Sequence, residues 1–227
     1  MKMLVRRFIE KIKWIYKARI IKDPLCVALS DWYKAKGDTT LRVDYPLTSE
    51  SVVLDIGGYS GDWSLQIANR YNPHLFIFEP VPFFFEKIQH KFASNSKVKV
   101  FNYGLSDTTQ RKAISILEDG SSVFRSSDNR LDVSFVNICE FLENTTIGKI
   151  DLVKINIEGG EYLLLPKMVD SGIVNMCMDI QVQFHNFVPG AYELRRDIRE
   201  SLSRTHRLTY DFSFVWENWR HKCQPVT

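Results

Sequence analysis

Five short apolar runs, each followed by a helical pattern or a turn, constrain the fold of this chain more than any other feature. The runs lie at residues 51–56, 75–78, 97–101, 150–155 and 176–184, and helical patterns lie near 63–70, 82–93, 136–144, after 161 and at 191–204. Strands that are apolar throughout are typical of parallel sheets with both faces covered. The alternation therefore predicts an α/β fold with a mostly parallel sheet of about seven strands and helices on both faces. We further expect a hairpin at 112–124 and a final strand or strand pair at 207–215.

The N-terminal segment differs from the rest of the chain. Leu4, Phe8, Ile12 and Ile15 recur at helical spacing, and Pro24 is expected to end that helix. Residues 1–22 carry a net charge of +7, so the other 205 residues carry −4 of the chain's total of +3. We expect a basic amphipathic helical extension at 1–45 before a domain at 46–227. Its helix either packs on the body or a second subunit, or lies on an anionic membrane surface.

Composition excludes several classes of protein. With 44% hydrophobic and 25% charged residues, the chain has the makeup of a globular domain rather than a disordered one. The mildly acidic body argues against a nucleic-acid partner. The four cysteines form no CxxC pair, and no apolar secretory stretch opens the sequence. We therefore expect a cytoplasmic protein with reduced thiols, with or without peripheral membrane contact, and its oligomeric state stays open.

The first strand runs into a glycine-rich loop that opens a helix. This loop supplies Asp55, Gly57, Gly58, Tyr59 and Gly61 as candidate binding residues. A dinucleotide fingerprint starting at Gly57 would also need glycines where Tyr59 and Asp62 stand, so a nicotinamide cofactor is disfavoured. Asp55 suits a ligand with a positive end better than a pyrophosphate. S-adenosylmethionine (SAM), with its ammonium and sulfonium groups, is such a ligand.

The next two strands supply candidates for the nucleoside part of that ligand. Glu79 ends the second strand, beside Pro80, and an acid at this position accepts hydrogen bonds from both ribose hydroxyls. The turn after the third strand offers Asn102, Gly104, Leu105 and Ser106 to border an adenine ring.

Polar residues also cluster after the fourth and fifth strands. Asn156, Glu158 and Glu161 follow the fourth strand, and His185 follows the fifth. The ends of neighbouring parallel strands meet at one edge of a sheet, so these four should face a shared substrate. An unperturbed imidazole is largely neutral at pH 7, so we expect His185 to act as a general base, with Glu158 as the competing candidate.

Taken together, these motifs resemble a known family. VLDIGGYSGDWSLQIA, FIFEP, NYGLSD, IDLVKINIEGGEYLLL and VQFH are similar, in order and spacing, to the FkbM family of SAM-dependent methyltransferases. The resemblance covers about residues 50–190 and implies a class I methyltransferase (Rossmann-like) fold. The family usually has Asn at the position of Tyr59 and Asp at the position of Asn156. The amide in place of an acid argues against a metal at this site.

The resemblance implies methyl transfer from SAM to a hydroxyl, which we expect to be on a sugar of a glycan or glycoconjugate. One alternative is a non-catalytic SAM-binding protein that serves as a docking module, which the exchange at Asn156 keeps open. The other alternative is a dinucleotide-dependent oxidoreductase, which is disfavoured because Tyr59 and Asp62 replace two glycines of the fingerprint.

Overall fold

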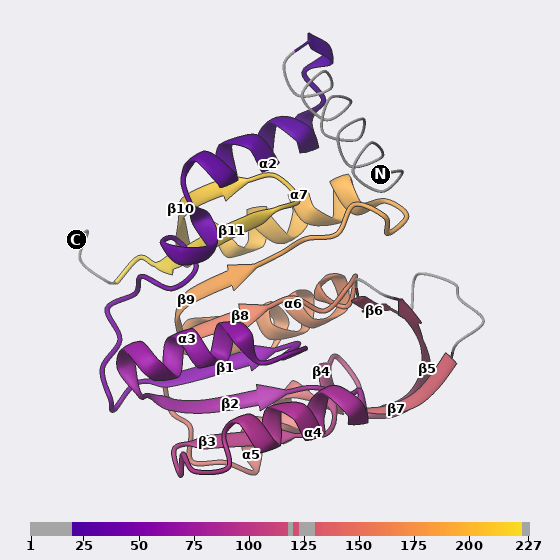
Figure 1. The fold of residues 1–227 in the computed structure, drawn as a ribbon. Coiled ribbons are helices and arrows are strands. Elements are labelled where there is room, and N and C mark those ends of the chain that lie inside the picture. The colour runs from indigo at the N-terminus through magenta and orange to yellow at the C-terminus, as the bar shows by residue number, and fades with distance from the viewer. Residues whose placement is uncertain (1–19, 118–119, 123–129, 224–227) are drawn as a thin grey trace, which may run out of the picture.

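The computed structural model describes residues 20–117, 120–122 and 130–223, and its centre is a seven-stranded sheet (Figure 1). The strands are β1 (Val52–Ile56), β2 (His74–Phe78), β3 (Val98–Phe101), β8 (Ile150–Ile155), β9 (Cys177–Val182), β10 (His206–Phe212) and β11 (Trp216–His221). Their spatial order is β10-β11-β9-β8-β1-β2-β3, and β11 alone runs in the opposite direction to the other six strands. The predicted α/β fold and seven-stranded, mostly parallel sheet are confirmed.

Helices cover both faces of this sheet because alternate residues of each strand point to opposite sides. Helices α3 (Asp62–Tyr71) and α4 (Pro82–Lys91) share one core with Val53 of β1. Helices α5 (Ile138–Glu143), α6 (Glu161–Asp170) and α7 (Ala191–Leu202) share the opposite core with its neighbour Leu54. Burial on both sides explains why the central strands are mainly apolar.

A second, four-stranded sheet extends from one end of the first (Figure 1). It contains β4 (Gly104–Ser106), β5 (Gln110–Leu117), β6 (Gly120–Ser122) and β7 (Arg130–Asn137), in the order β4-β7-β5-β6. The predicted hairpin corresponds to β5 and β6, although residues 118–119 and 123–129 lie outside the described part. Strand β7 was not predicted, even though apolar residues alternate at Leu131, Val133 and Phe135. The helix expected from 136 begins at Ile138, because the Asn137 side chain caps it.

The N-terminal segment is described only from residue 20, so the amphipathic pattern expected over residues 1–22 lies almost wholly outside the described residues. Pro24, expected to end a helix, is the first residue of helix α2 (Pro24–Lys34), where its missing N–H costs nothing. Trp32 of α2 packs on Tyr210 and Phe212 of β10. None of the described helices is long and apolar enough to cross a membrane.

After α2, a short helix η2 (Gly37–Thr39) leads into a segment that reaches β1. Val43, Tyr45 and Leu47 of this segment are buried in the same core as α3. The described part of the expected extension 1–45 is therefore joined to the domain 46–227 by shared packing.

Candidate functional site

The loops that follow β1, β2 and β8 enclose a cavity of about 360 Å³. This volume falls in the range of roughly 300–1,000 Å³ that is typical of small-molecule sites. Nine of the predicted residues line it: Gly57, Gly58, Tyr59, Glu79, Pro80, Gly104, Ser106, Asn156 and Glu158. Six do not: Asp55, Gly61, Asn102, Leu105, Glu161 and His185. The structure thus brings most of the predicted site together and gives the remainder supporting positions.

The glycine loop has almost no room for side chains. Gly57 adopts a φ of +90°, and a Cβ atom there would lie 2.0 Å from the backbone oxygen of Asn156. A Cβ on Gly58 would lie 2.5 Å from a methyl group of Ile77. Tyr59 has a φ of +49°, and its N–H donates to Glu79. The loop backbone therefore closely approaches the neighbouring strand ends, and only glycine fits at Gly57.

Asp55 does not present a free carboxylate to the cavity, unlike the sequence-based expectation. Its Oδ1 accepts a hydrogen bond of 2.8 Å from Lys154 Nζ, and its Oδ2 accepts one from the Ser64 hydroxyl. Lys154 also donates to the Gly57 carbonyl oxygen at 2.6 Å and itself lines the cavity. Burial lowers the pKa of Lys154, while the charge of Asp55 raises it. Asp55 therefore binds a lysine, and the lysine rather than the acid lines the cavity.

Lys154 lies within the motif IDLVKINIEGGEYLLL, but no role was predicted for it from the sequence. Asp55 and Lys154 are directly paired in the register of β1 and β8, one residue before each strand ends. Opposite charges one residue before the ends of two predicted strands were the signal that could have found this pair.

Glu79 is buried at the end of β2 and lines the cavity. Its Oε2 accepts the N–H of Tyr59 at 2.7 Å, and its Oε1 accepts the N–H of Val81 at 2.9 Å. Burial raises the pKa of Glu79 to about 7, against the lowering effect of these two hydrogen bonds. Each carboxylate oxygen can accept a second hydrogen bond, so Glu79 can still bind hydroxyl groups of a ligand.

Two residues of the turn after β3 support the site from outside the cavity. The Asn102 side chain donates to the backbone oxygens of Glu79 and Pro80, at 3.2 and 3.3 Å. Leu105 is buried in the core shared with α5 and α6. Asn102 therefore stabilises the turn that carries Glu79. Leu105 packs in the core rather than in the cavity lining.

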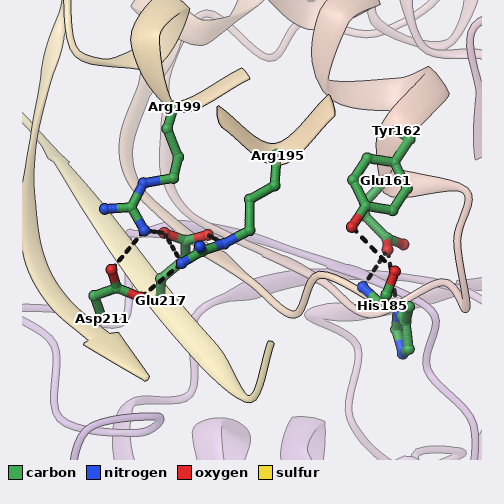
Figure 2. Close-up of polar contacts among 7 residues, drawn as sticks. All are labelled: Glu161, Tyr162, His185, Arg195, Arg199, Asp211 and Glu217. Carbon is green, nitrogen blue, oxygen red and sulfur yellow. Dashed lines mark hydrogen bonds and ion pairs between the residues drawn. The ribbon is translucent and has the colours of Figure 1, made fainter. Parts of the chain in front are cut away.

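His185 lies between the carboxylates of Glu158 and Glu161. Its Nδ1 is 3.0 Å from Glu161 Oε1, and its Nε2 is 3.4 Å from Glu158 Oε1. Glu161 is fully buried and also accepts the backbone N–H groups of Gly159 and His185, each at 2.9 Å. Figure 2 shows this pair beside Tyr162, whose hydroxyl donates to the His185 carbonyl oxygen at 3.0 Å.

This arrangement changes the expected role of His185. Burial alone lowers the pKa of the imidazole, but the hydrogen bonds and charges of Glu158 and Glu161 outweigh it and raise the pKa to about 9. His185 is therefore protonated at neutral pH and cannot accept a proton, contrary to the expectation of a neutral imidazole. Glu158, whose side chain is 19% exposed and lines the cavity, is the acid left to face a substrate.

The protonated His185 makes stability depend on pH. A histidine pKa of about 9 in the folded chain, against about 6.5 when unfolded, contributes stability that is fully present below pH 6.5. It is lost as the pH rises through 9. We expect wild type to lose roughly 3 kcal/mol more between these pH values than His185→Asn, measured by denaturant unfolding. His90→Asn, at an exposed position of α4, should follow wild type, and equal pH slopes for wild type and His185→Asn would contradict the assignment.

A second cluster in Figure 2 lies outside the cavity lining. Arg195 and Arg199 of α7 form ion pairs with Asp211 and Glu217 of the C-terminal hairpin. Burial raises the pKa of Glu217 to about 7, although both arginines lower it. This cluster attaches α7 to β10 and β11 and supports the fold rather than the chemistry.

Aromatic side chains lie along part of the cavity, and of these only Tyr59 was predicted from the sequence. The rings of Tyr59 and Phe84 lie 4.4 Å apart, and Phe83 contacts Phe84 at 5.4 Å with 69% of its surface exposed. The lining also includes Arg42, Trp63 and Lys112. Within the described ranges, no three His, Cys, Asp or Glu side chains form a group that could hold a metal ion.

Comparison with known proteins places the chain in a family. Three solved structures align with much of the chain at low identity. A precorrin-6y C5,15-methyltransferase from Geobacter metallireducens is 14% identical, with 77% of this chain and 72% of that chain covered and a TM-score of 0.44. A fibrillarin pre-rRNA processing protein from Methanococcus jannaschii is 10% identical, with coverages of 80% and 70% and a TM-score of 0.48. An rRNA methylase from Streptococcus thermophilus is 10% identical, with coverages of 77% and 89% and a TM-score of 0.45.

No curated protein sequence matches the chain. Residues 55–212, however, match the methyltransferase FkbM domain, which includes every strand end around the cavity. This match covers the candidate site except for the lining residues that precede β1, Asp38 and Arg42. The chain belongs to the FkbM family of methyltransferases and has the class I methyltransferase fold.

Proposed function

We propose that this chain transfers a methyl group from SAM to a hydroxyl group, on a sugar of a glycan or glycoconjugate. The observation that carries the proposal is one cavity lined by Glu79 and by Glu158. The first acid lies where a nucleoside cofactor would be bound, and the second faces space for an acceptor. Membership of the family and the fold imply SAM as the cofactor.

The residues present fit this cofactor. The glycine loop brings the backbone close to a ligand, and Glu79 can accept hydrogen bonds from both ribose hydroxyls. Pro80, Gly104 and Ser106 also line the cavity and would border the adenine. Asn156 Oδ1 is buried and has no hydrogen-bond partner within the described part of the chain, so it is available to a donor on the ligand.

When bound, SAM supplies an electrophilic methyl group on a positively charged sulfur. The chain's own residues must hold the acceptor oxygen close to that methyl group and take up its proton. We assign the proton acceptor to the Glu158 carboxylate, because His185 is already protonated. His185 and Glu161 then act as positioning residues that hold Glu158. Positioning of this kind contributes on the order of 7–11 kcal/mol, and a placed base adds ~10²–10⁴-fold in rate.

The aromatic side chains beside the cavity, those of Tyr59, Phe83 and Phe84, support a sugar as the acceptor. One face of a sugar ring carries mainly C–H groups, and such a face packs well on aromatic rings. Tyr59, Phe83 and Phe84 offer these rings beside the cavity, and Phe83 and Tyr59 remain exposed. Exposed apolar groups next to a cavity commonly mark a binding surface.

The test is incubation of the chain with methyl-labelled SAM and a panel of glycans and glycoconjugates. We expect label in the sugar fraction as a methyl ether, which resists the mild alkali that cleaves methyl esters. Label that mild alkali releases would contradict hydroxyl methylation. Binding of S-adenosylhomocysteine without transfer to any acceptor would instead favour the non-catalytic alternative.

Glu79→Ala should weaken SAM binding by about 1.5–3 kcal/mol, the range for hydrogen bonds to a charged group. Titration calorimetry measures this directly, with Glu86→Ala at an exposed position of α4 as the control. Because the pKa of Glu79 is raised to about 7, its carboxylate becomes charged as the pH rises from 6 to 8. Wild-type affinity should therefore increase over this interval, while that of Glu79→Gln stays flat. Unchanged affinity in Glu79→Ala would remove Glu79 from the ribose site.

A further inference from the structure

Two positively charged side chains, Arg42 and Lys154, lie close to Trp63 at one end of the cavity, and Arg42 lies outside the matched family domain. Arg42 lies between η2 and β1, and its side chain is only 17% exposed. Its guanidinium carbon lies 4.0 Å from the ring centroid of Trp216, and Nη1 is 3.1 Å from Asp38 Oδ1. The Nε atom is buried and has no hydrogen-bond partner among the residues described. A buried donor without a partner is rare and indicates a missing acceptor.

The backbone of Arg42 is firmly attached to the domain. Its carbonyl oxygen accepts a hydrogen bond of 2.9 Å from Trp63 Nε1 and one of 3.1 Å from Gln181 Nε2. Trp63 belongs to the first turn of α3, directly after the glycine loop, and Gln181 belongs to β9. Arg42 is thus held beside the loop before any ligand binds, stacked on one aromatic ring, and needs little reordering.

Lys154 supplies the second charge at this end. It lines the same cavity, and the positive charge of Arg42 is close enough to lower its pKa. Asp55, the acid paired with Lys154, has its other oxygen bonded to Ser64. Asp38, the acid paired with Arg42, also lines the cavity but is 57% exposed, and Arg42 Nε keeps no partner among the residues described. This end of the cavity therefore suits an anionic group, whereas sequence analysis had expected Asp55 to bind a cationic one.

The position of Glu79 indicates which anionic group would lie at this end, because it sets the direction in which the cofactor would extend. With the ribose at Glu79 and the adenine beside Gly104, the rest of the cofactor extends past the glycine loop toward α3 and β8. Arg42 and Lys154 lie there. The methionine part of SAM ends in a carboxylate, and a planar guanidinium pairs with a carboxylate through two hydrogen bonds.

We propose that Arg42, together with Lys154, binds the carboxylate of the methionine part of SAM, an inference that rests on SAM as the cofactor in the proposed function. The segment before β1 then completes the cofactor site.

Calorimetry with two ligands tests this without any acceptor. S-adenosylhomocysteine carries the carboxylate, and 5′-methylthioadenosine lacks the entire amino-acid group. We expect Arg42→Gln to bind S-adenosylhomocysteine about 10- to 100-fold more weakly than wild type and to bind 5′-methylthioadenosine equally well. Arg42→Lys keeps the positive charge but not the paired N–H donors of the guanidinium. Its affinity for S-adenosylhomocysteine should therefore lie between those of wild type and Arg42→Gln.

Arg70→Gln is a matched control. Arg70 also pairs with an acid of the segment before β1, Asp44, at 2.8 Å, and lies over the Tyr71 ring, but it does not line the cavity. It should bind both ligands like wild type. An equal loss for both ligands in Arg42→Gln, or no loss for either, would overturn the inference. Wild type that binds S-adenosylhomocysteine but methylates no sugar would refute the proposed acceptor alone, whereas no binding at all would refute the cofactor and this inference together.

Discussion

Replacing Glu158 by glutamine is expected to lower kcat by ~10²–10⁴-fold while the affinity for S-adenosylhomocysteine changes little. Glutamine keeps the size and hydrogen-bonding reach of the side chain but cannot accept a proton. A sugar hydroxyl is a weak nucleophile until its proton begins to leave. The carboxylate beside the protonated His185 is the acceptor that the cavity offers.

Two further variants provide a control and a comparison for this experiment. Glu193→Gln changes an exposed acid of α7 in the same way and should leave kcat at the wild-type value. His185→Asn removes the imidazolium but leaves Glu158, so its kcat should fall less than that of Glu158→Gln. A larger loss for His185→Asn, with only a small loss for Glu158→Gln, would return the role of base to the histidine.

Gly57→Ala is expected to destabilise the fold by more than the ~3 kcal/mol that bounds most point mutations. The new Cβ would lie 2.0 Å from a backbone oxygen of Asn156, and an alanine at a φ of +90° is strained wherever it is placed. Either β1 and β8 must separate or the loop must leave its position. Denaturant unfolding measures the loss.

Gly148→Ala provides the comparison. A Cβ at Gly148 would meet nothing within 4 Å, so this variant should unfold within about 0.5 kcal/mol of wild type. If Gly57→Ala were equally stable, the close approach between the loop and Asn156 would not be a real constraint of the fold.

The main sheet could be predicted from sequence because its strands are buried on both faces. Runs such as residues 75–78 are then continuous and apolar, with their side chains divided between the two cores. Strand β7 lies in the smaller sheet with partly exposed residues, so its pattern is weaker and it was missed. The final hairpin was expected at 207–215, but its second strand, β11, begins only at Trp216.

Part of the cavity lining could be predicted because it lies within a few residues of a strand end, as for Glu79 and Glu158. Side-chain partners could not, because they depend on contacts between distant segments. Asp55 and Lys154 are 99 residues apart, and only their pairing shows that the acid is neutralised. The two carboxylates around His185 likewise reverse its expected protonation. Arg42 belongs to no strand end, and nothing in its local sequence distinguishes it from a surface arginine.

The contact between the segment before β1 and the last strand has a consequence for synthesis of the chain. The Tyr45 hydroxyl donates to Asn218 across 173 residues and accepts a hydrogen bond from Gln181. Trp216, which stacks on Arg42, also belongs to that last strand. A ribosome must therefore synthesise the chain through β11 before these early residues can reach their final positions. The glycine loop and the central strands can assemble earlier, but the Arg42 end of the cavity becomes complete only after β11 has left the ribosome.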